Sequence, residues 1–241
     1  YLAGNEVPFS SSFIPADVAA PIADLDLADA PTSSSIQWIG NTPKVPVEVA
    51  ATGPRVIGIA ARHAERVLLA VGAIPERLAW GIETARRAAE AADRDPAALR
   101  FGAYVNVACH DDRRVARDLS RAGTSLFARF SVMHGAISGP VDDDQSAVLR
   151  NIHDSYDMNA HAQAGGEQTK ALTDDFIDDY SIVGNSAHCI ERLQAIEALG
   201  IDKVIINGPT FTARSHEAAE AADRFTKEVI PALRGRSTAT T

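Results

Sequence analysis

The alternation of hydrophobic and polar positions changes at Pro46. Residues 1–45 show no sustained period and carry repeated prolines and serine runs such as Ser10-Ser11-Ser12. This composition is typical of turns and irregular chain, so we expect irregular surface structure with short extended pieces. A stretch of this length without regular structure is unusual inside a compact domain. We therefore expect residues 1–45 to drape over a body that the rest of the protein forms.

Beyond Pro46, short apolar runs alternate with segments of helical period. Strands are predicted at residues 47–51, 66–71, 101–109 and 203–207. Helices are predicted at residues 55–63 and 75–92, from 111–112 onward, from Asn185 or Ser186 to Gly200, and at 215–233. Residues 111–180 show helical segments with loops and no evident strand, which predicts a mainly helical insertion between the strands.

The order of these elements predicts an α/β fold, because strands that alternate with helices form a parallel sheet covered by helices. The strands are apolar on both faces, as buried parallel strands are. Four strands do not close a barrel, which needs about eight. Two architectures therefore remain open: a small open α/β sheet, or a barrel of which a large part lies outside this numbering. Because the first residue is Tyr1 rather than Met, we expect the numbering to begin inside a longer gene product.

The first candidate site is the turn Ala51-Thr52-Gly53-Pro54, which joins a predicted strand to a helix. In parallel α/β folds, ligands bind at the carboxyl ends of the strands. Gly53 would let a phosphate approach the backbone, Pro54 presets the first helical turn, and Thr52 adds a hydroxyl donor. The free N–H groups and the dipole of the helix would then hold the anion.

A second strand end, formed by Val71, Gly72 and Ala73, also leads into a helix. Two adjacent strand ends of this kind predict one shared phosphate site, with ordinary tight turns as the alternative. A third strand end, Asn207-Gly208-Pro209, is interpreted as turn chemistry, with ligand contact as the alternative.

The remaining polar residues form no recognisable catalytic set. His110 ends a strand and could face the mouth of the site, although a polar residue before a helix cap explains it more simply. His134 belongs to residues 129–135, which either line an apolar pocket or pack at a helix end. No histidine pair has metal-ligand spacing, and no nucleophile elbow, paired-carboxylate site or CxxC motif is present. No metal is therefore predicted, and a bound redox cofactor would supply the chemistry.

Charge and cysteine content narrow the possible partners. The formal net charge is -9, so nothing favours nucleic acid or an anionic membrane surface. Cys109 and Cys189 are far apart and lack a partner motif, so neither a disulfide framework nor a zinc site is expected, and a reducing cytoplasm fits. No stretch has the length of a transmembrane helix, and no signal peptide opens the chain.

Several segments together resemble the luciferase-like flavin- and deazaflavin-dependent oxidoreductases. They are residues 46–54, 68–73, 75–78, 102–107, 128–135 and 180–184. Their order and spacing carry the resemblance, which covers most of residues 40–235. The branch of the family that they resemble is similar to methylenetetrahydromethanopterin reductase, which uses the deazaflavin coenzyme F-420.

The resemblance implies a (β/α)8 TIM barrel with insertions, present here as a single domain over residues 1–241 without its N-terminal strands, and a homodimer. It also implies that the turns at residues 51–54 and 71–73 line the cofactor phosphate. The family's early strands, which carry much of the ring-binding face and the usual acid/base residues, have no counterpart here, so no catalytic residue is assigned. Sugar-phosphate dehydrogenases of the family place a lysine where this chain has Gly72-Ala73-Ile74, which argues against that substrate.

The leading hypothesis is an oxidoreductase that moves a hydride between coenzyme F-420 and a small organic substrate. One alternative is an FMN-dependent luciferase-like monooxygenase. The other is a non-catalytic barrel fragment or partner subunit, which the low strand count motivates.

Overall fold

The computed structural model describes residues 1–11, 15, 18, 29, 31–40, 42–209 and 216–237. The chain divides into two compact units, residues 1–46 and 47–241, and each is described by itself. In the first unit, β1 (Val7–Pro8) pairs antiparallel with β2 (Ser33–Ser34), and two short 3-10 turns follow these strands, at Phe9–Ser11 and Gln37–Ile39. The described part of this unit thus has the short extended pieces that its composition predicts. That residues 1–241 form one barrel domain stays a prediction.

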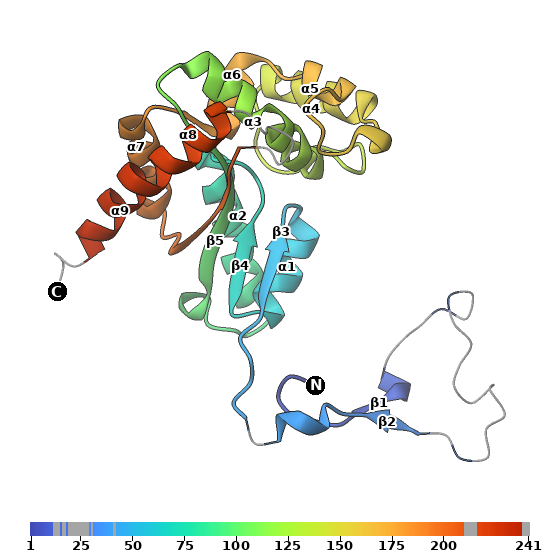
Figure 1. Ribbon diagram of the computed structural model, residues 1–241. Coiled ribbons are helices and arrows are strands. Elements are labelled where there is room, and N and C mark those ends of the chain that lie inside the picture. The colour runs from blue at the N-terminus through green and yellow to red at the C-terminus, as the bar shows by residue number, and fades with distance from the viewer. Residues whose placement is uncertain are drawn as a thin grey trace. The chain divides into compact units, whose positions relative to one another are not determined.

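The second unit is built on a five-stranded parallel sheet (Figure 1). The strands β3 (Glu48–Ala51), β4 (Arg66–Leu69) and β5 (Arg100–Cys109) are consecutive neighbours. Both β6 (Ile182–Gly184) and β7 (Lys203–Asn207) pair with β5 at different points along its length. The predicted parallel α/β arrangement is confirmed, and the four predicted strands are all present.

The strand count from the sequence was one too low. The strand β6 is only three residues long, so it offers no period to recognise, and it exists because Val107, Ala108 and Cys109 of β5 provide its hydrogen-bonding partner. Among the described residues, β3 pairs only with β4, and β7 pairs only with β5. The sheet therefore has open edges in this structure, and the closure of an eight-stranded barrel stays a prediction.

Two helices that follow strands cover one face of the sheet (Figure 1). They are α1 (Pro54–His63) and α2 (Pro75–Glu90), and each begins with a proline in its first turn. Proline suits that position because its missing N–H has no helical partner there. Their apolar stripes bury Ile57 and Leu78 completely in the main core, where they meet Val105 of β5. The helix stripe predicted from the spacing of Leu78, Ile82, Ala85 and Ala89 is confirmed.

Residues 113–180 form the mainly helical insertion that the sequence predicts. Its helices are α3 (Arg113–Ala128), α4 (Asp143–Ser155), α5 (Glu167–Lys170) and α6 (Asp174–Tyr180), with 3-10 turns at Arg129–Ser131 and Met158–Ala160. Leu119, Ile152 and Phe176 belong to a second hydrophobic cluster that holds these helices together. The same cluster includes Ala108 of β5 and Val183 of β6, so it also fixes the insertion to the sheet.

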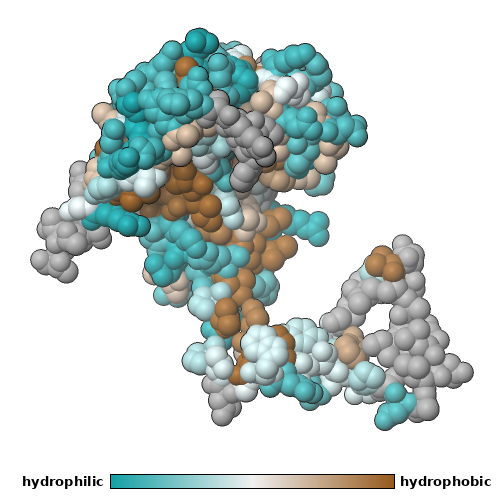
Figure 2. All heavy atoms as spheres, in the orientation of Figure 1, coloured by the Kyte–Doolittle hydropathy of each residue, from teal (hydrophilic) through white to brown (hydrophobic). Residues whose placement is uncertain are grey.

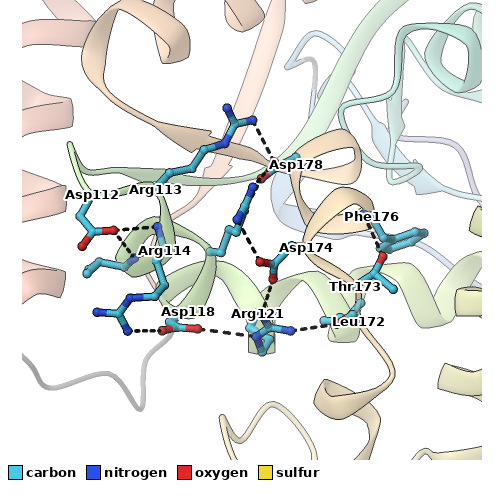
Figure 3. A network of polar contacts seen from close by, with 12 residues as sticks. Asp112, Arg113, Arg114, Asp118, Arg121, Leu172, Thr173, Asp174, Phe176 and Asp178 are labelled. Atoms are coloured by element: carbon cyan, nitrogen blue, oxygen red, sulfur yellow. Dashed lines mark hydrogen bonds and ion pairs between the residues drawn. The ribbon is translucent and has the colours of Figure 1, made fainter.

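Ion pairs join α3 to α6 within this insertion (Figure 3). Arg117 lies 2.8 Å from Asp178, Arg113 lies 2.9 Å from the same carboxylate, and Arg121 lies 3.1 Å from Asp174. Burial raises the pKa of Asp178, but the two guanidinium groups outweigh it and hold that pKa below its usual value. Because α6 leads directly into β6, the ion pairs between α3 and α6 also help to position the segment that joins α6 to β6.

The chain ends in α7 (Ser186–Ala198), β7, and a helical run made of α8 (His216–Arg224), a π-helical turn (Phe225–Val229) and α9 (Ile230–Ser237). Asn185 caps α7, and Gly200 ends it with a positive φ of 88°, as predicted. Ser215, the predicted start of the last helix, lies outside the described residues. The inward face of this last helix was predicted to include Ala222, but Ala222 is exposed. Ala221 is buried in its place, because the buried stripe of α8 continues three residues after Ala218.

The amino ends of the strands are joined by an ionic cluster. Arg66, although buried, contacts Glu48 at 2.8 Å and also hydrogen-bonds Asp202, while Lys203 contacts Glu48 at 2.6 Å. The hydrogen bond from Lys203 holds the pKa of Glu48 below its usual value. These pairs connect β3, β4 and β7 at one end of the sheet, which leaves the carboxyl ends as the place for a ligand.

Candidate functional site

The turn after β3 leads into the amino end of α1 and is open to solvent. Gly53 caps α1 with an extended backbone (φ −88°, ψ 157°), and its carbonyl accepts the first helical hydrogen bond from Ile57 at 3.0 Å. Thr52 donates from Oγ1 to the carbonyl of Ala70 at 3.2 Å, which ties this turn to the end of β4. The first turn of α1 holds no acidic residue, so nothing opposes the positive end of its dipole. Thr52 and Gly53 are half-buried and Pro54 is exposed, so a ligand can reach the turn.

The turn after β4 is different, because protein groups already occupy it. Val71, Gly72 and Ala73 are all buried. The N–H of Ala73 donates to the carbonyl of Tyr180 at 2.8 Å, and its own carbonyl accepts from Arg192 at 3.2 Å. Gly72 has a φ of 86°, and a Cβ there would lie 2.8 Å from the ring of Tyr180. Glycine at position 72 therefore allows the backbone to lie close against the ring of Tyr180.

The role of Gly72 predicts a large loss of stability for Gly72→Ala. The left-handed backbone costs about 1–2 kcal/mol for an L side chain, and overpacking against a buried ring adds about 1–3 kcal/mol. The matched control is Gly200→Ala, where φ is 88° but nothing lies within 4 Å of the new Cβ. Urea denaturation of both variants separates the two effects, and equal losses would show that Tyr180 does not constrain Gly72.

A buried arginine joins the turn after β4 to the insertion. Arg77 of α2 is 1% exposed and donates to the carbonyls of Val71 (3.0 Å), Pro140 (3.0 Å) and Ser138 (2.9 Å) and to the hydroxyl of Ser131 (2.8 Å). Burial lowers the pKa of Arg77, because a charge without surrounding water is less stable. Its hydrogen bonds hold residues 131–140 over the start of α2.

The same segment also reaches the turn after β3. A Cβ on Gly53 would lie 3.5 Å from Oγ of Ser138, so this serine stands beside the open turn. Ser138 therefore links the two predicted phosphate turns, since its carbonyl accepts from Arg77 and its hydroxyl lies near Gly53. The sequence analysis did not single out either Arg77 or Ser138 as a site residue. No local pattern marks them, because their contacts join segments that are distant along the chain.

Two asparagines on neighbouring strands were also missed as a pair. Asn106 of β5 and Asn207 of β7 are register partners near the carboxyl end of the sheet. Within the described part of the chain, Oδ1 of Asn106 and Nδ2 of Asn207 are buried and lack a hydrogen-bond partner. Buried polar atoms without partners are rare in proteins, which makes the pair a candidate ligand contact. An asparagine at the same register position of two adjacent strands is the sequence signal that could have identified this pair.

The histidines singled out by the sequence have structural roles. Nδ1 of His110 accepts from the N–H of Asp112 at 3.0 Å, just before the cap of α3, which matches the simpler interpretation of this residue. His134 and Met133 are exposed at a turn after the 3-10 helix, so they line no enclosed pocket. Among the residues that the structure describes, no group of three His, Cys, Asp or Glu side chains could hold a metal ion.

In the described residues no helix is long and apolar enough to cross a membrane.

At the third predicted strand end, Gly208 is exposed and nothing lies within 4 Å of a Cβ built on it.

A parallel sheet whose carboxyl-end turns lead into helices defines an α/β fold, and ligands of such folds bind at the carboxyl ends of the strands. Residues 13–203 match the family model of the luciferase-like monooxygenases, and the chain belongs to this family.

Two methanopterin reductases are among its relatives and structural neighbours. The chain is 24% identical over 201 residues to 5,10-methylenetetrahydromethanopterin reductase of Archaeoglobus fulgidus, a match that covers 79% of this chain and 55% of the relative. The structure of the coenzyme F420-dependent tetrahydromethanopterin reductase from Methanopyrus kandleri aligns with a TM-score of 0.54 at 18% identity, covering 78% of this chain and 50% of the other.

An F420-dependent secondary alcohol dehydrogenase in complex with an F420-acetone adduct also aligns with a TM-score of 0.54, at 17% identity, over 80% of this chain and 50% of the other. These likenesses show an α/β fold similar to that of luciferase-like proteins. The chain spans about half the length of the relatives that it matches.

Proposed function

We propose that this chain forms the phosphate-binding part of a deazaflavin site in a luciferase-like oxidoreductase. In this proposal the cofactor is coenzyme F-420, and a hydride moves between it and a small organic substrate. The observation that carries the proposal is the turn Thr52-Gly53-Pro54 at the start of α1, which is accessible, free of acidic residues and held by Thr52 to β4.

The spacing of the polar groups supports a phosphate at one point and a ring at another. Ala51 pairs with Leu69, and Leu69 pairs with Ala103, so β3 ends level with Ala103, shortly before Asn106 on β5. Two strand spacings separate β3 from β5, roughly 10 Å across the sheet. The phosphate and the ring system of a flavin or deazaflavin are joined by a flexible chain that can span such a distance. The amide edge of that ring would suit Nδ2 of Asn207, whereas Oδ1 of Asn106 packs against Gly123 of α3.

The roles of the chain's own residues in this proposal are binding and orientation. The backbone N–H groups at the start of α1 hold the phosphate. The hydroxyl of Thr52, which donates to the carbonyl of Ala70, keeps the turn in place. Arg77 keeps residues 131–140 beside the turn, where Ser138 limits the access of water. The bound cofactor supplies the hydride chemistry. A well-oriented donor and acceptor gain about 7–11 kcal/mol from positioning alone, so this arrangement needs no protein nucleophile.

The cofactor is tested by titration of the purified chain with F-420 and, separately, with FMN. Binding is followed by the absorbance or fluorescence of each cofactor. We expect saturable binding of F-420 and weaker binding of FMN. Saturable FMN binding without F-420 binding would instead favour a flavin-dependent monooxygenase, the alternative that the family name supports.

One feature of the sheet favours the alternative in which this chain functions only together with a second polypeptide. Val204, Ile205 and Ile206 of the edge strand β7 are half-buried, although buried parallel strands are normally covered on both faces. Beside them an apolar groove is lined by Leu193, Ile201, Phe225 and Leu233, and Figure 2 shows hydrophobic side chains gathered along this part of the sheet.

This observation leads to a second proposal, in which added strands complete the barrel. If the folded chain binds neither cofactor but gains binding when the missing strands are supplied, the chain is one part of the barrel. If it stays inert, it is a non-catalytic fragment or partner subunit. A homodimer, which the resemblance implies, and a cytoplasmic location, which the cysteine content fits, stay predictions.

A further inference from the structure

The two cysteines, distant in sequence, lie together at the carboxyl end of β5. Cys109 is the last residue of β5 and pairs in register with Gly184 of β6. Cys189 lies in the first turns of α7, and its Sγ is 3.6 Å from the carbonyl oxygen of that same Gly184. Both side chains therefore lie beside Gly184, and each cysteine is the largest influence on the pKa of the other. No local pattern in the sequence marks this pair, because β5 and α7 come together through the pairing of β6 with β5.

The two sulfur atoms have different surroundings. Sγ of Cys109 is 3.5 Å from Oγ of Ser186, whose hydroxyl hydrogen-bonds the carboxylate of Glu228 in the π-helical turn. Both cysteines are buried, but Ser186 is half-buried and Glu228 is exposed. Cys109 therefore lies one polar side chain beneath the surface, within reach of a small reagent. Cys189 packs in the main hydrophobic core.

We propose that Cys109 and Cys189 are a peroxide-sensitive thiol pair, in which Cys109 reacts first and Cys189 resolves the product. The thiolate of Cys109 attacks one oxygen of a peroxide, the O–O bond breaks, and Cys109 becomes a sulfenic acid while one water is released after protonation. Sγ of Cys189 then attacks Sγ of Cys109 and displaces the second water. Two thiols are oxidised to one disulfide, and one hydrogen peroxide is reduced to two waters.

The electrostatics agree with this order of reaction. The interaction with Cys189 and the charge of Arg224 lower the pKa of Cys109 to about 7, although burial opposes them. The interaction with Cys109 and burial raise the pKa of Cys189 well above its usual value. A thiolate is the reactive form of cysteine, so Cys109 is the first site of attack. The resulting disulfide would fasten the start of α7 to the end of β5.

The first test uses the whole chain and hydrogen peroxide, without cofactor. After graded peroxide exposure, the protein is denatured, alkylated and digested, and the peptides are identified by mass spectrometry. The exposed Met133 and Met158 serve as internal references for the peroxide dose. We expect a peptide linked through Cys109 and Cys189 to predominate while most of both methionines are still unoxidised. If both methionines convert to sulfoxide while both cysteines still alkylate, the proposal is wrong.

Two single variants test the order of attack. In Cys189→Ser, Cys109 should accumulate as a sulfenic acid that dimedone traps. In Cys109→Ser, Cys189 should remain a thiol at the same peroxide dose. The reverse pattern, or disulfides that form only between chains, would overturn the assignment. Because the wild-type measurement needs no variant, misfolding of either one leaves the first test valid. The result is also independent of the cofactor, so failure here does not bear on the proposed deazaflavin site.

Discussion

Gly53→Asp is expected to weaken phosphate-dependent cofactor binding at least tenfold, or about 1.4 kcal/mol. The backbone of Gly53 is extended, and a Cβ there makes only an ordinary contact with Ser138 at 3.5 Å, so aspartate fits without strain. Aspartate is also a favoured cap, and its carboxylate would take the N–H groups of α1 that are proposed to hold the phosphate. Two like charges about 4 Å apart near a protein surface repel by about 4 kcal/mol, which partial exposure reduces.

The matched control for this variant is Gly53→Asn. Asparagine has nearly the same shape and caps helices as well as aspartate does, but it carries no charge. Calorimetric titration with the cofactor should show a much smaller loss for asparagine than for aspartate, while both variants keep the thermal stability of the wild type. Unchanged affinity in Gly53→Asp would remove this turn from the site. Equal losses in both variants would mean that shape, and not charge, governs the turn.

Arg77→Met is expected to lower the free energy of unfolding by about 3 kcal/mol. Methionine recovers the cost of burying the guanidinium charge, but it leaves four acceptors without their donor. They are the carbonyls of Val71, Ser138 and Pro140 and the hydroxyl of Ser131. Val71 and Ser131 are buried, whereas water can reach the carbonyls of Ser138 and Pro140. Each buried acceptor without a partner costs about 1–3 kcal/mol, so the loss at Val71 and Ser131 outweighs the recovered charge.

The control on the same helix is Arg87→Met. The side chain of Arg87 is 64% exposed, and its ion pair with Glu83 is 3.4 Å long. Exposed pairs of this kind contribute little, so a change within about 0.5 kcal/mol is expected. Urea denaturation followed by circular dichroism compares the two variants. Similar stabilities for both would show that the hydrogen bonds of Arg77 contribute nothing to the fold.

The sequence was sufficient for those elements whose signals are local. Proline at the start of α1 and α2, the cap at Asn185 and the stop at Gly200 are all encoded within a few residues. The apolar runs of β4, β5 and β7 are likewise visible as continuous segments. The order of strands and helices then predicts a parallel sheet, because only that arrangement buries strands that are apolar on both faces.

The site depends more on contacts between distant segments, and there the sequence was less informative. Gly72 matches the pattern of a phosphate turn, yet the ring of Tyr180 occupies the space beside it. Arg77 would normally be placed on a solvated helix face, but residues 131–140 bury it. The pairing of Asn106 with Asn207 requires the register of β5 with β7. None of these relations has a periodic signal, so they become visible only in the folded chain.

The central position of β5 also bears on the order in which the chain folds. Its first half pairs with β4, which precedes it, whereas β6 and β7 are synthesised much later. Ala103 and Val204 are neighbours in the sheet although roughly a hundred residues separate them, and such non-local pairings slow folding. During synthesis, β5 therefore exposes an unpaired edge until the helical insertion has emerged. We expect the insertion, whose contacts are mostly its own, to become compact on the ribosome before the sheet is complete.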